Sequence, residues 1–154
     1  MNPTASAYVD GLKLLARREL SELQVRQRLA RRGHDAEAID AAIARLREER
    51  AIDDARVAEA IARTESSLRR RGRVRVRMQI ERAGIAKSIA RQATDEAFDG
   101  IDEDTQIELA LKKRLRGRTT IADDREFQRL YRFLIGQGFE SDLVMKTLRS
   151  RYTR

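Results

Sequence analysis

The 154-residue sequence contains no cysteine, no tryptophan and a single proline. Without cysteine the chain can form neither disulfides nor thiolate-ligated metal sites, and a reducing cytoplasm is the expected setting. Aromatic residues make up only 5% of the chain, and no apolar run approaches the length of a transmembrane helix. The first six residues lack the apolar core of a secretory signal peptide. We therefore expect a cytoplasmic protein with no membrane partner.

Residues suited to catalysis or to metal binding are equally scarce. His34 is the only histidine, and neither cysteine nor carboxylate stands at ligand spacing from it, so we expect it to pack or to occupy a turn. The acidic run 95–104 does not match the spacing of an EF-hand loop. The sequence also has no Walker loop and no Ser-His-Asp arrangement. We expect no enzyme activity, no cofactor and no metal site.

What the sequence does contain is one pattern repeated three times, in which a glycine follows a hydrophobic residue by four positions. The pattern spans 29–33, 80–84 and 134–138, and its glycines are 51 and 54 residues apart. Each glycine precedes a new run of apolar residues at helical spacing, which is typical of a glycine that closes one helix before the next begins. Three such joints at a nearly constant period predict an array of small helical modules. Arrays of this kind usually present an extended surface to a partner and seldom enclose a catalytic pocket.

The predicted fold is all-α, with three tandem three-helix repeats of helix-turn-helix type in an elongated or curved array. Leu, Ala, Arg and Glu dominate the composition, which favours helices with exposed polar faces. Modules of about 50 residues bury too little surface to be stable alone, so we expect each to be stabilised by packing against its neighbours. The predicted boundaries are a flexible N-terminus over 1–6, repeat 1 over 7–52, repeat 2 over 53–100 and repeat 3 over 101–154.

Helix starts can be recognised in each repeat. Ser21 and Asp35 are good N-caps in repeat 1, and one aspartate of each pair at 53–54 and 123–124 is a good N-cap in the later repeats. An aspartate pair could also suggest acid/base chemistry. Because the pair recurs before a second helical pattern, capping is the better interpretation.

Repeat 2 contains one segment whose pattern is ambiguous. Residues 73–80 alternate between polar and apolar side chains with period two, which is typical of a strand. We predict a helix instead, because no pairing strand is nearby and the run occupies the place of a helix in repeat 1. Val76, Ile80 and Ala83 would then share one helical face. The preceding helix is predicted to be long, with Leu68 on its apolar stripe.

The net charge of +8 is unevenly distributed along the chain. Residues 63–91 carry ten basic and two acidic groups, whereas residues 92–104 carry six acids and no base. Because a merely solvated surface would not sort its charges in this way, the middle of the chain is predicted to meet a polyanion. Arginines here could neutralise phosphates without reading sequence, or pair with carboxylates of a protein. We call the candidate residues of repeat 2 the arginine cluster: Arg69, Arg70, Arg71, Arg73, Arg75, Arg77 and Arg82.

A second basic patch lies near the predicted C-terminus of the first helix in repeat 3. It consists of Lys112, Lys113, Arg114, Arg116 and Arg118. Cations at a helix C-terminus are favoured by the helix dipole, which explains part of this patch without any partner. The second basic patch is therefore a less specific candidate for nucleic-acid or protein binding than the arginine cluster.

Several short pieces of the chain match a known family in their order and spacing. The pieces are Leu14–Leu23, Leu29–Gly33, Leu46 with Ile52–Ala58, Arg71–Arg73, Ile80–Ile85 and Phe133–Phe139. Through them the chain, from about Ala7 to Tyr152, resembles the RecX family of bacterial regulators of the RecA recombinase. Two positions depart from the family pattern, since His34 stands where the family usually has an aromatic residue and Val57 where it usually has Phe.

The resemblance implies tandem three-helix repeats and a non-enzymatic modulator, mainly an inhibitor, of RecA. Such proteins bind in the groove of the RecA–DNA filament, and they also bind single- and double-stranded DNA with little sequence preference. They restrain filament growth, strand exchange, ATP hydrolysis and the SOS response, and thereby act on homologous recombination and DNA repair. The partners implied for this chain are the RecA nucleoprotein filament and DNA. No surplus apolar face suggests a dimer, so we expect a monomer.

Two other function classes stay open on the sequence alone. Residues 24–44 resemble the helix-turn-helix of a transcriptional regulator, although their second helix starts with acids and alanines, which suit neither phosphates nor base edges. If the protein were a helical-repeat adaptor that binds only proteins, its cations would serve solubility alone. The concentration of charge in repeat 2 disfavours this class. A sequence-specific duplex footprint would support the first class. RecA binding without salt-sensitive DNA affinity would support the second.

Overall fold

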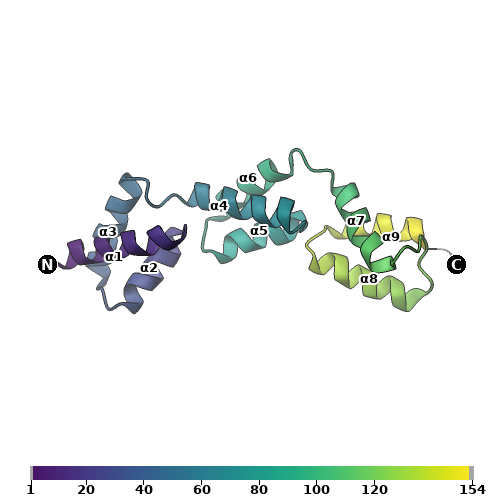
Figure 1. Ribbon diagram of the computed structural model, residues 1–154, viewed down its shortest axis with the longest axis horizontal. Coiled ribbons are helices and arrows are strands. Elements are labelled where there is room, and N and C mark those ends of the chain that lie inside the picture. Colours follow the sequence, from purple (N-terminus) through teal and green to yellow (C-terminus); the bar gives the residue numbers. More distant parts are fainter. Residues whose placement is uncertain (1, 153–154) are drawn as a thin grey trace. The chain divides into compact units, whose positions relative to one another are not determined.

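The computed structural model describes residues 2–152, which form nine α-helices and one π-helical turn (Figure 1). Within these residues the only β-type pairing is an isolated bridge between Ile121 and Tyr152. The fold is therefore all-α, as predicted. The helices are α1 (Pro3–Arg17), α2 (Glu22–Arg31), α3 (Ala36–Glu48), α4 (Asp54–Arg63), the π-helical η1 (Thr64–Leu68), α5 (Arg73–Arg82), α6 (Lys87–Phe98), α7 (Glu103–Leu115), α8 (Asp124–Gly136) and α9 (Ser141–Arg151).

The described residues group into two compact units. Unit 1 comprises the chain up to Ile61 together with Gln79–Ala93, and unit 2 comprises Ala62–Met78 together with the chain from Thr94 onward. Because this division passes through α4, α5 and α6, it does not follow the three predicted repeats, whose boundaries stay a prediction. No helix within residues 2–152 is long and apolar enough to cross a bilayer.

In unit 1, helices α1, α2 and α3 pack against one another (Figure 1). Their core consists of Leu20, Val25, Leu29, Ile39, Ile43, Leu46 and Ile52. Helix α1 starts at Pro3, within the segment 1–6 that was expected to be a flexible N-terminus. The Asn2 side chain accepts a hydrogen bond from the Thr4 amide at 2.9 Å, and proline fits the first turn of a helix because no amide partner is needed there.

In unit 2, helices α7, α8 and α9 pack against one another and supply its main core (Figure 1). That core consists of Ile107, Leu111, Leu115, Ile121, Leu130, Leu134, Phe139, Val144 and Leu148. Phe127 of α8 meets the ring of Tyr152 edge to face, with ring centroids 5.4 Å apart. The apolar face of α8 is thus used within the unit, and its other face is left for solvent or a partner.

The predicted helix caps are confirmed. Ser21, Asp35 and Asp123 each accept a hydrogen bond from a first-turn amide of α2, α3 and α8. Asp53 does the same for α4, accepting from the Arg56 amide at 3.1 Å. These aspartates therefore satisfy helix N-termini, which is the role expected of them in place of acid/base chemistry.

The three repeated glycines end α2, α5 and α8 in the left-handed conformation that was predicted. Their φ angles are 90° at Gly33, 83° at Gly84 and 98° at Gly138. At Gly138 space also demands glycine, because an added Cβ would overlap Arg75. The carbonyl of Gly138 accepts a hydrogen bond from the Val74 amide at 3.0 Å, which ties the start of α5 to the turn after α8.

Two predictions for repeat 2 had different outcomes. Residues 73–80 lie within α5 and are helical, and Val76 and Ile80 are fully buried, so the helical interpretation is confirmed. The placement of Leu68 on an apolar stripe is wrong, since its side chain is 79% exposed. The α-helical pattern stops at Arg63, and the wider π-helical turn η1 rotates the following residues out of register.

Candidate functional site

The arginine cluster begins immediately after the π-helical turn, where the backbone leaves helical geometry. Arg70 has a φ of 54°, which is uncommon for a residue other than glycine. Nη1 of Arg69 lies 3.1 Å from Oε1 of Glu65, a carboxylate that is itself buried. The Arg71 guanidinium donates a hydrogen bond to the side-chain oxygen of Gln137. Arg69 and Arg71 thus hold this segment in place, and Arg70 is exposed at its tip.

Arg73, the first residue of α5, is engaged by acids of its own unit. Its Nη1 lies 2.6 Å from Oδ1 of Asp95, and its Nε lies 3.8 Å from Oε2 of Glu103. The guanidinium carbon also stands 5.1 Å from the centroid of the Phe98 ring, within cation–π range. Burial raises the pKa of Glu103, and Arg73 partly offsets that effect. An incoming phosphate would have to compete with Asp95 for this arginine.

The remaining arginines of α5 differ in their surroundings. Arg75 is half-buried and donates a hydrogen bond from Nη1 to the Gly136 carbonyl at 3.0 Å, so it caps the end of α8. Arg77 and Arg82 are exposed. Arg82 lies in unit 1, whereas the other members of the arginine cluster lie in unit 2. The structure therefore places Arg69 through Arg77 in one compact unit together with the second basic patch.

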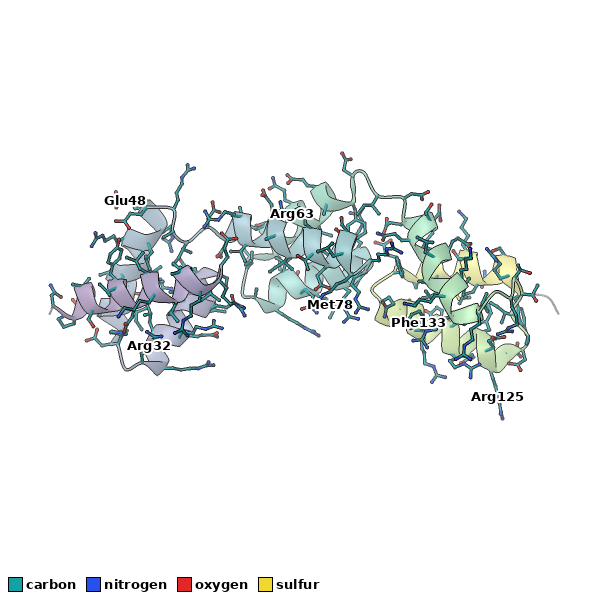
Figure 2. All side chains as sticks on the ribbon, viewed as in Figure 1. Arg32, Glu48, Arg63, Met78, Arg125 and Phe133 are labelled. Carbon is teal, nitrogen blue, oxygen red and sulfur yellow. The ribbon has the colours of Figure 1, made fainter. Side chains whose placement is uncertain are left out.

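Three of the five residues of the second basic patch lie in the last turns of α7. Lys112, Lys113 and Arg114 are exposed in its last turns, and Arg116 is exposed in the left-handed conformation that ends the helix, with a φ of 52°. The Arg114 guanidinium stacks over the ring of Phe133, 3.9 Å from its centroid. Figure 2 labels Phe133 on α8. Helix-dipole compensation explains the location of these cations, and their exposure leaves them accessible to an anion.

Arg118 differs from the rest of its patch because its charge is matched internally. Both terminal nitrogens of its guanidinium bond to the carboxylate of Glu126, one oxygen each. Glu126 also accepts a hydrogen bond from the Ala122 amide at 2.8 Å, and its residue is only 8% exposed. The Arg118 guanidinium, with help from the Ala122 amide, lowers the pKa of Glu126 to about 2. This ion pair fastens the loop before α8 to that helix.

The sequence interpretation missed a further set of exposed cations, on the outer face of α8. Arg125, Arg129 and Arg132 are exposed there and line one shallow hollow together with Asp124 and Gln128. The signal was present as arginines at helical spacing within 124–136. It was overlooked because residues 119–154 together carry a small net charge, which hides how that charge is arranged around one helix.

His34 has a structural environment, as expected from its isolation in the sequence. Its Nε2 lies 2.7 Å from Oδ2 of Asp10, and its side chain is 12% exposed. The hydrogen bond with His34 lowers the pKa of Asp10, with a smaller contribution from Arg32. The contact joins the turn after α2 to α1 within unit 1.

Helices α2 and α3 form the helix-turn-helix-like element that could suit a transcriptional regulator. The start of α3 offers little for reading base edges, because Ala38 and Ile39 are buried in unit 1. Asp40 on the same helix pairs with Arg26 of α2, with Nη1 and Oδ1 2.6 Å apart. The element thus serves the packing of unit 1, and its exposed start is acidic.

Known proteins resemble this chain in sequence. A family model described as "RecX, first three-helix domain" matches residues 7–46. The regulatory protein RecX of Halorhodospira halophila is 34% identical over 138 residues, which cover 86% of this chain and 80% of that protein. The regulatory protein RecX of Acidithiobacillus ferrooxidans is 35% identical over 147 residues, which cover 96% of this chain and 89% of that protein.

Solved structures resemble it in fold. The crystal structure of RecX from Lactobacillus salivarius matches with a TM-score of 0.77 at 19% identity, over 97% of this chain and 96% of that chain. A second crystal structure of a regulatory protein RecX also gives a TM-score of 0.77, at 23% identity, over 97% of this chain and 72% of that chain. These two structures show a likeness in fold. The sequence relatives are more than 30% identical to this chain along most of both chains. The chain therefore belongs to the RecX family of regulatory proteins.

Proposed function

We propose that this protein is a non-enzymatic modulator of the RecA recombinase, mainly an inhibitor, that binds the RecA–DNA filament in its groove and binds DNA directly. It restrains filament growth, strand exchange, ATP hydrolysis and the SOS response, and it acts in the cytoplasm as a monomer. The observation that carries the proposal is membership of the RecX family, through relatives named regulatory protein RecX that align along most of this chain.

The exposed cations support a role against a polyanion. In unit 2, Arg70 and Arg77 are exposed, and Lys112, Lys113 and Arg116 are exposed near the end of α7. Lys and Arg side chains that neutralise phosphates release condensed counterions, which gives affinity without sequence preference. A protein that acts on any RecA filament needs this kind of binding, because the DNA within the filament has no fixed sequence.

The internally paired arginines have a different part in the proposal. Arg73 and Arg118 already have carboxylate partners, so they position α5 and the loop before α8. The same α5 carries Arg77 and begins three residues after Arg70. Binding is therefore assigned to the exposed residues Arg70, Arg77, Lys112, Lys113 and Arg116. Positioning of the surface is assigned to Arg73 and Arg118, through their contacts with Asp95 and Glu126.

The test is RecA-catalysed strand exchange between homologous DNA molecules, with and without this protein. At amounts stoichiometric with RecA, the protein should slow the appearance of exchanged product, and the rate should recover when excess RecA is added. A rate that stays unchanged at stoichiometric and higher amounts would remove the proposed function. A control without RecA shows whether the protein alone alters the DNA substrates.

A further inference from the structure

The outer face of α8 carries a row of cations outside the arginine cluster and the second basic patch. Arg125, Arg129 and Arg132 stand at positions i, i+4 and i+7, so they share one side of the helix. All three are exposed, and Gln128 lies among them in the same hollow. Figure 2 shows Arg125 extending away from the ribbon of α8. We call these four residues the α8 face.

The acids near the α8 face are occupied by partners within unit 2. Asp123 accepts the Glu126 amide as the helix cap, at 2.9 Å. Asp124, which borders the hollow, accepts a hydrogen bond from the Tyr152 hydroxyl. Glu126 is held by Arg118, with Arg129 contributing only the weakest of the charge effects on its pKa. The charge of Glu126 is matched by Arg118, whereas Asp123 and Asp124 bond only to neutral donors and stay charged, so these two carboxylates reduce the field of the three arginines in part.

The helix dipole does not explain the α8 face, in contrast to the second basic patch. Arg125 is the second residue of α8, close to the positive end of the dipole, where a cation is disfavoured. The first turn of a helix usually carries acids, and α8 does have Asp124 and Glu126 there. The dipole therefore gives no reason for a cation at Arg125, which Asp124 and Glu126 flank in the sequence.

The lining of the hollow indicates which anion fits. Among the described residues, only polar and charged side chains line it. Protein–protein interfaces usually combine arginine with apolar or aromatic anchors in buried pockets, and no apolar or aromatic side chain lines this hollow. About one helical turn separates successive arginines, a rise of about 6 Å from Arg125 to Arg129 and about 4.5 Å from Arg129 to Arg132, which suits a row of charges. The sugar-phosphate backbone of DNA is such a row, and the Gln128 amide adds a neutral donor for a phosphate oxygen.

We propose that the α8 face binds the DNA backbone, with Arg125, Arg129 and Arg132 each neutralising a phosphate. This inference rests on the proposed function for the presence of DNA, and adds a site on unit 2 that is separate in sequence from the arginine cluster. Binding there is independent of base sequence. It holds a strand along α8 and leaves the base edges unread.

The experiment measures the affinity of the full chain for a fluorescein-labelled oligo(dT) by anisotropy, over a series of salt concentrations. The variant R125Q/R129Q/R132Q removes the three charges while keeping residues that favour helix. If each arginine contacts one phosphate of a single strand, the slope of log affinity against log salt should fall by about 2. The matched control R17Q/R18Q/R31Q removes three exposed arginines of unit 1 and should leave the slope near that of the wild type.

The outcomes separate this inference from the proposed function. If the wild type binds the oligonucleotide and the triple variant keeps the wild-type slope, the α8 face is not a DNA site. A triple variant that binds DNA normally but loses affinity for the RecA filament would assign the face to a protein, which also overturns the inference. A wild type that binds no oligonucleotide overturns this inference and the direct DNA binding in the proposed function, whereas strand exchange tests the action on RecA. If the triple variant loses helical circular dichroism, the single variant R125Q replaces it, with an expected slope change of about 0.7.

Discussion

Arg118 and Glu126 form a bidentate ion pair in which each terminal nitrogen of the guanidinium meets one carboxylate oxygen. The pair connects the loop after α7 to the first turn of α8. Because Glu126 is buried, its carboxylate needs both this partner and the Ala122 amide to stay charged. An arginine that looked like a surface cation in the sequence thus stabilises the unit that carries the exposed ones.

Replacing Glu126 by Gln should destabilise the protein by about 2 kcal/mol, because Arg118 loses a charged partner and one hydrogen bond becomes a repulsive contact. Urea unfolding followed by circular dichroism at neutral pH measures the change. The control D142N alters an exposed acid in the first turn of α9 and should change the free energy of unfolding by less than about 0.5 kcal/mol.

The same pair predicts how stability depends on pH. The pKa of Glu126 is lowered from 4.5 to about 2 in the folded protein, so its contribution is complete above about pH 4.5. That contribution should be lost as the pH falls from about 4.5 toward 2, where the folded carboxylate also becomes protonated. Unfolding free energies of wild type and E126Q across this range are the measurement. Parallel curves for the two proteins would contradict the assignment.

Ser21 makes two hydrogen bonds from a fully buried position within unit 1. Its Oγ accepts from the Gln24 amide at 3.2 Å as the cap of α2 and donates to the Ala83 carbonyl at the end of α5. Ser21→Ala should lower the free energy of unfolding by about 2 kcal/mol, because the cap is lost and a carbonyl is left without this donor. Ser88→Ala, at an exposed serine of α6, is the control and should be nearly neutral. Equal effects of the two substitutions in thermal unfolding would show that the Ser21 contacts do not stabilise the fold.

Asp95 should restrain DNA binding by holding Arg73. Asp95→Asn removes the nearer carboxylate from the Arg73 guanidinium and leaves the longer contact with Glu103, so affinity for oligo(dT) should rise several-fold. Stability should fall by less than about 1 kcal/mol, as expected for an exposed ion pair. Asp99→Asn removes the same charge from an exposed acid of the same segment that has no bond to Arg73. If the two variants gain affinity equally, net charge alone is responsible and Arg73 has no special part.

The helical architecture could be predicted because its signals are local. N-caps such as Ser21, the left-handed glycines and the apolar face of Val76 and Ile80 all depend on residues within one or two turns. Leu68 was predicted on the apolar stripe because that prediction assumed a 3.6-residue period. The π-helical turn interrupts this period before the chain reaches Leu68. The hydrophobic periodicity of the sequence does not indicate that interruption.

The candidate site could be predicted only as a region of charge. Composition by segment located the excess of arginine, but it could not distinguish Arg70, which is exposed, from Arg73, which Asp95 holds across 22 positions of sequence. Tertiary pairing decides which cations are available, and it is absent from a linear pattern. The α8 face was missed for the converse reason, since neighbouring acids such as Asp123 and Asp124 offset its arginines in a count of charge along the sequence but bond to other groups in the fold.

The central claim is that exposed cations bring this protein onto nucleoprotein. The most direct measurement is its affinity for preassembled RecA filaments on single-stranded DNA as a function of salt, for the wild type, R70Q/R77Q and the matched control R18Q/R31Q. We predict that wild-type affinity falls steeply with salt, that R70Q/R77Q lowers the log–log slope by about 1.4 if each arginine meets one phosphate, and that the control changes it little. Filament binding that is insensitive to salt in the wild type, or a slope that R70Q/R77Q leaves unchanged, would contradict the account.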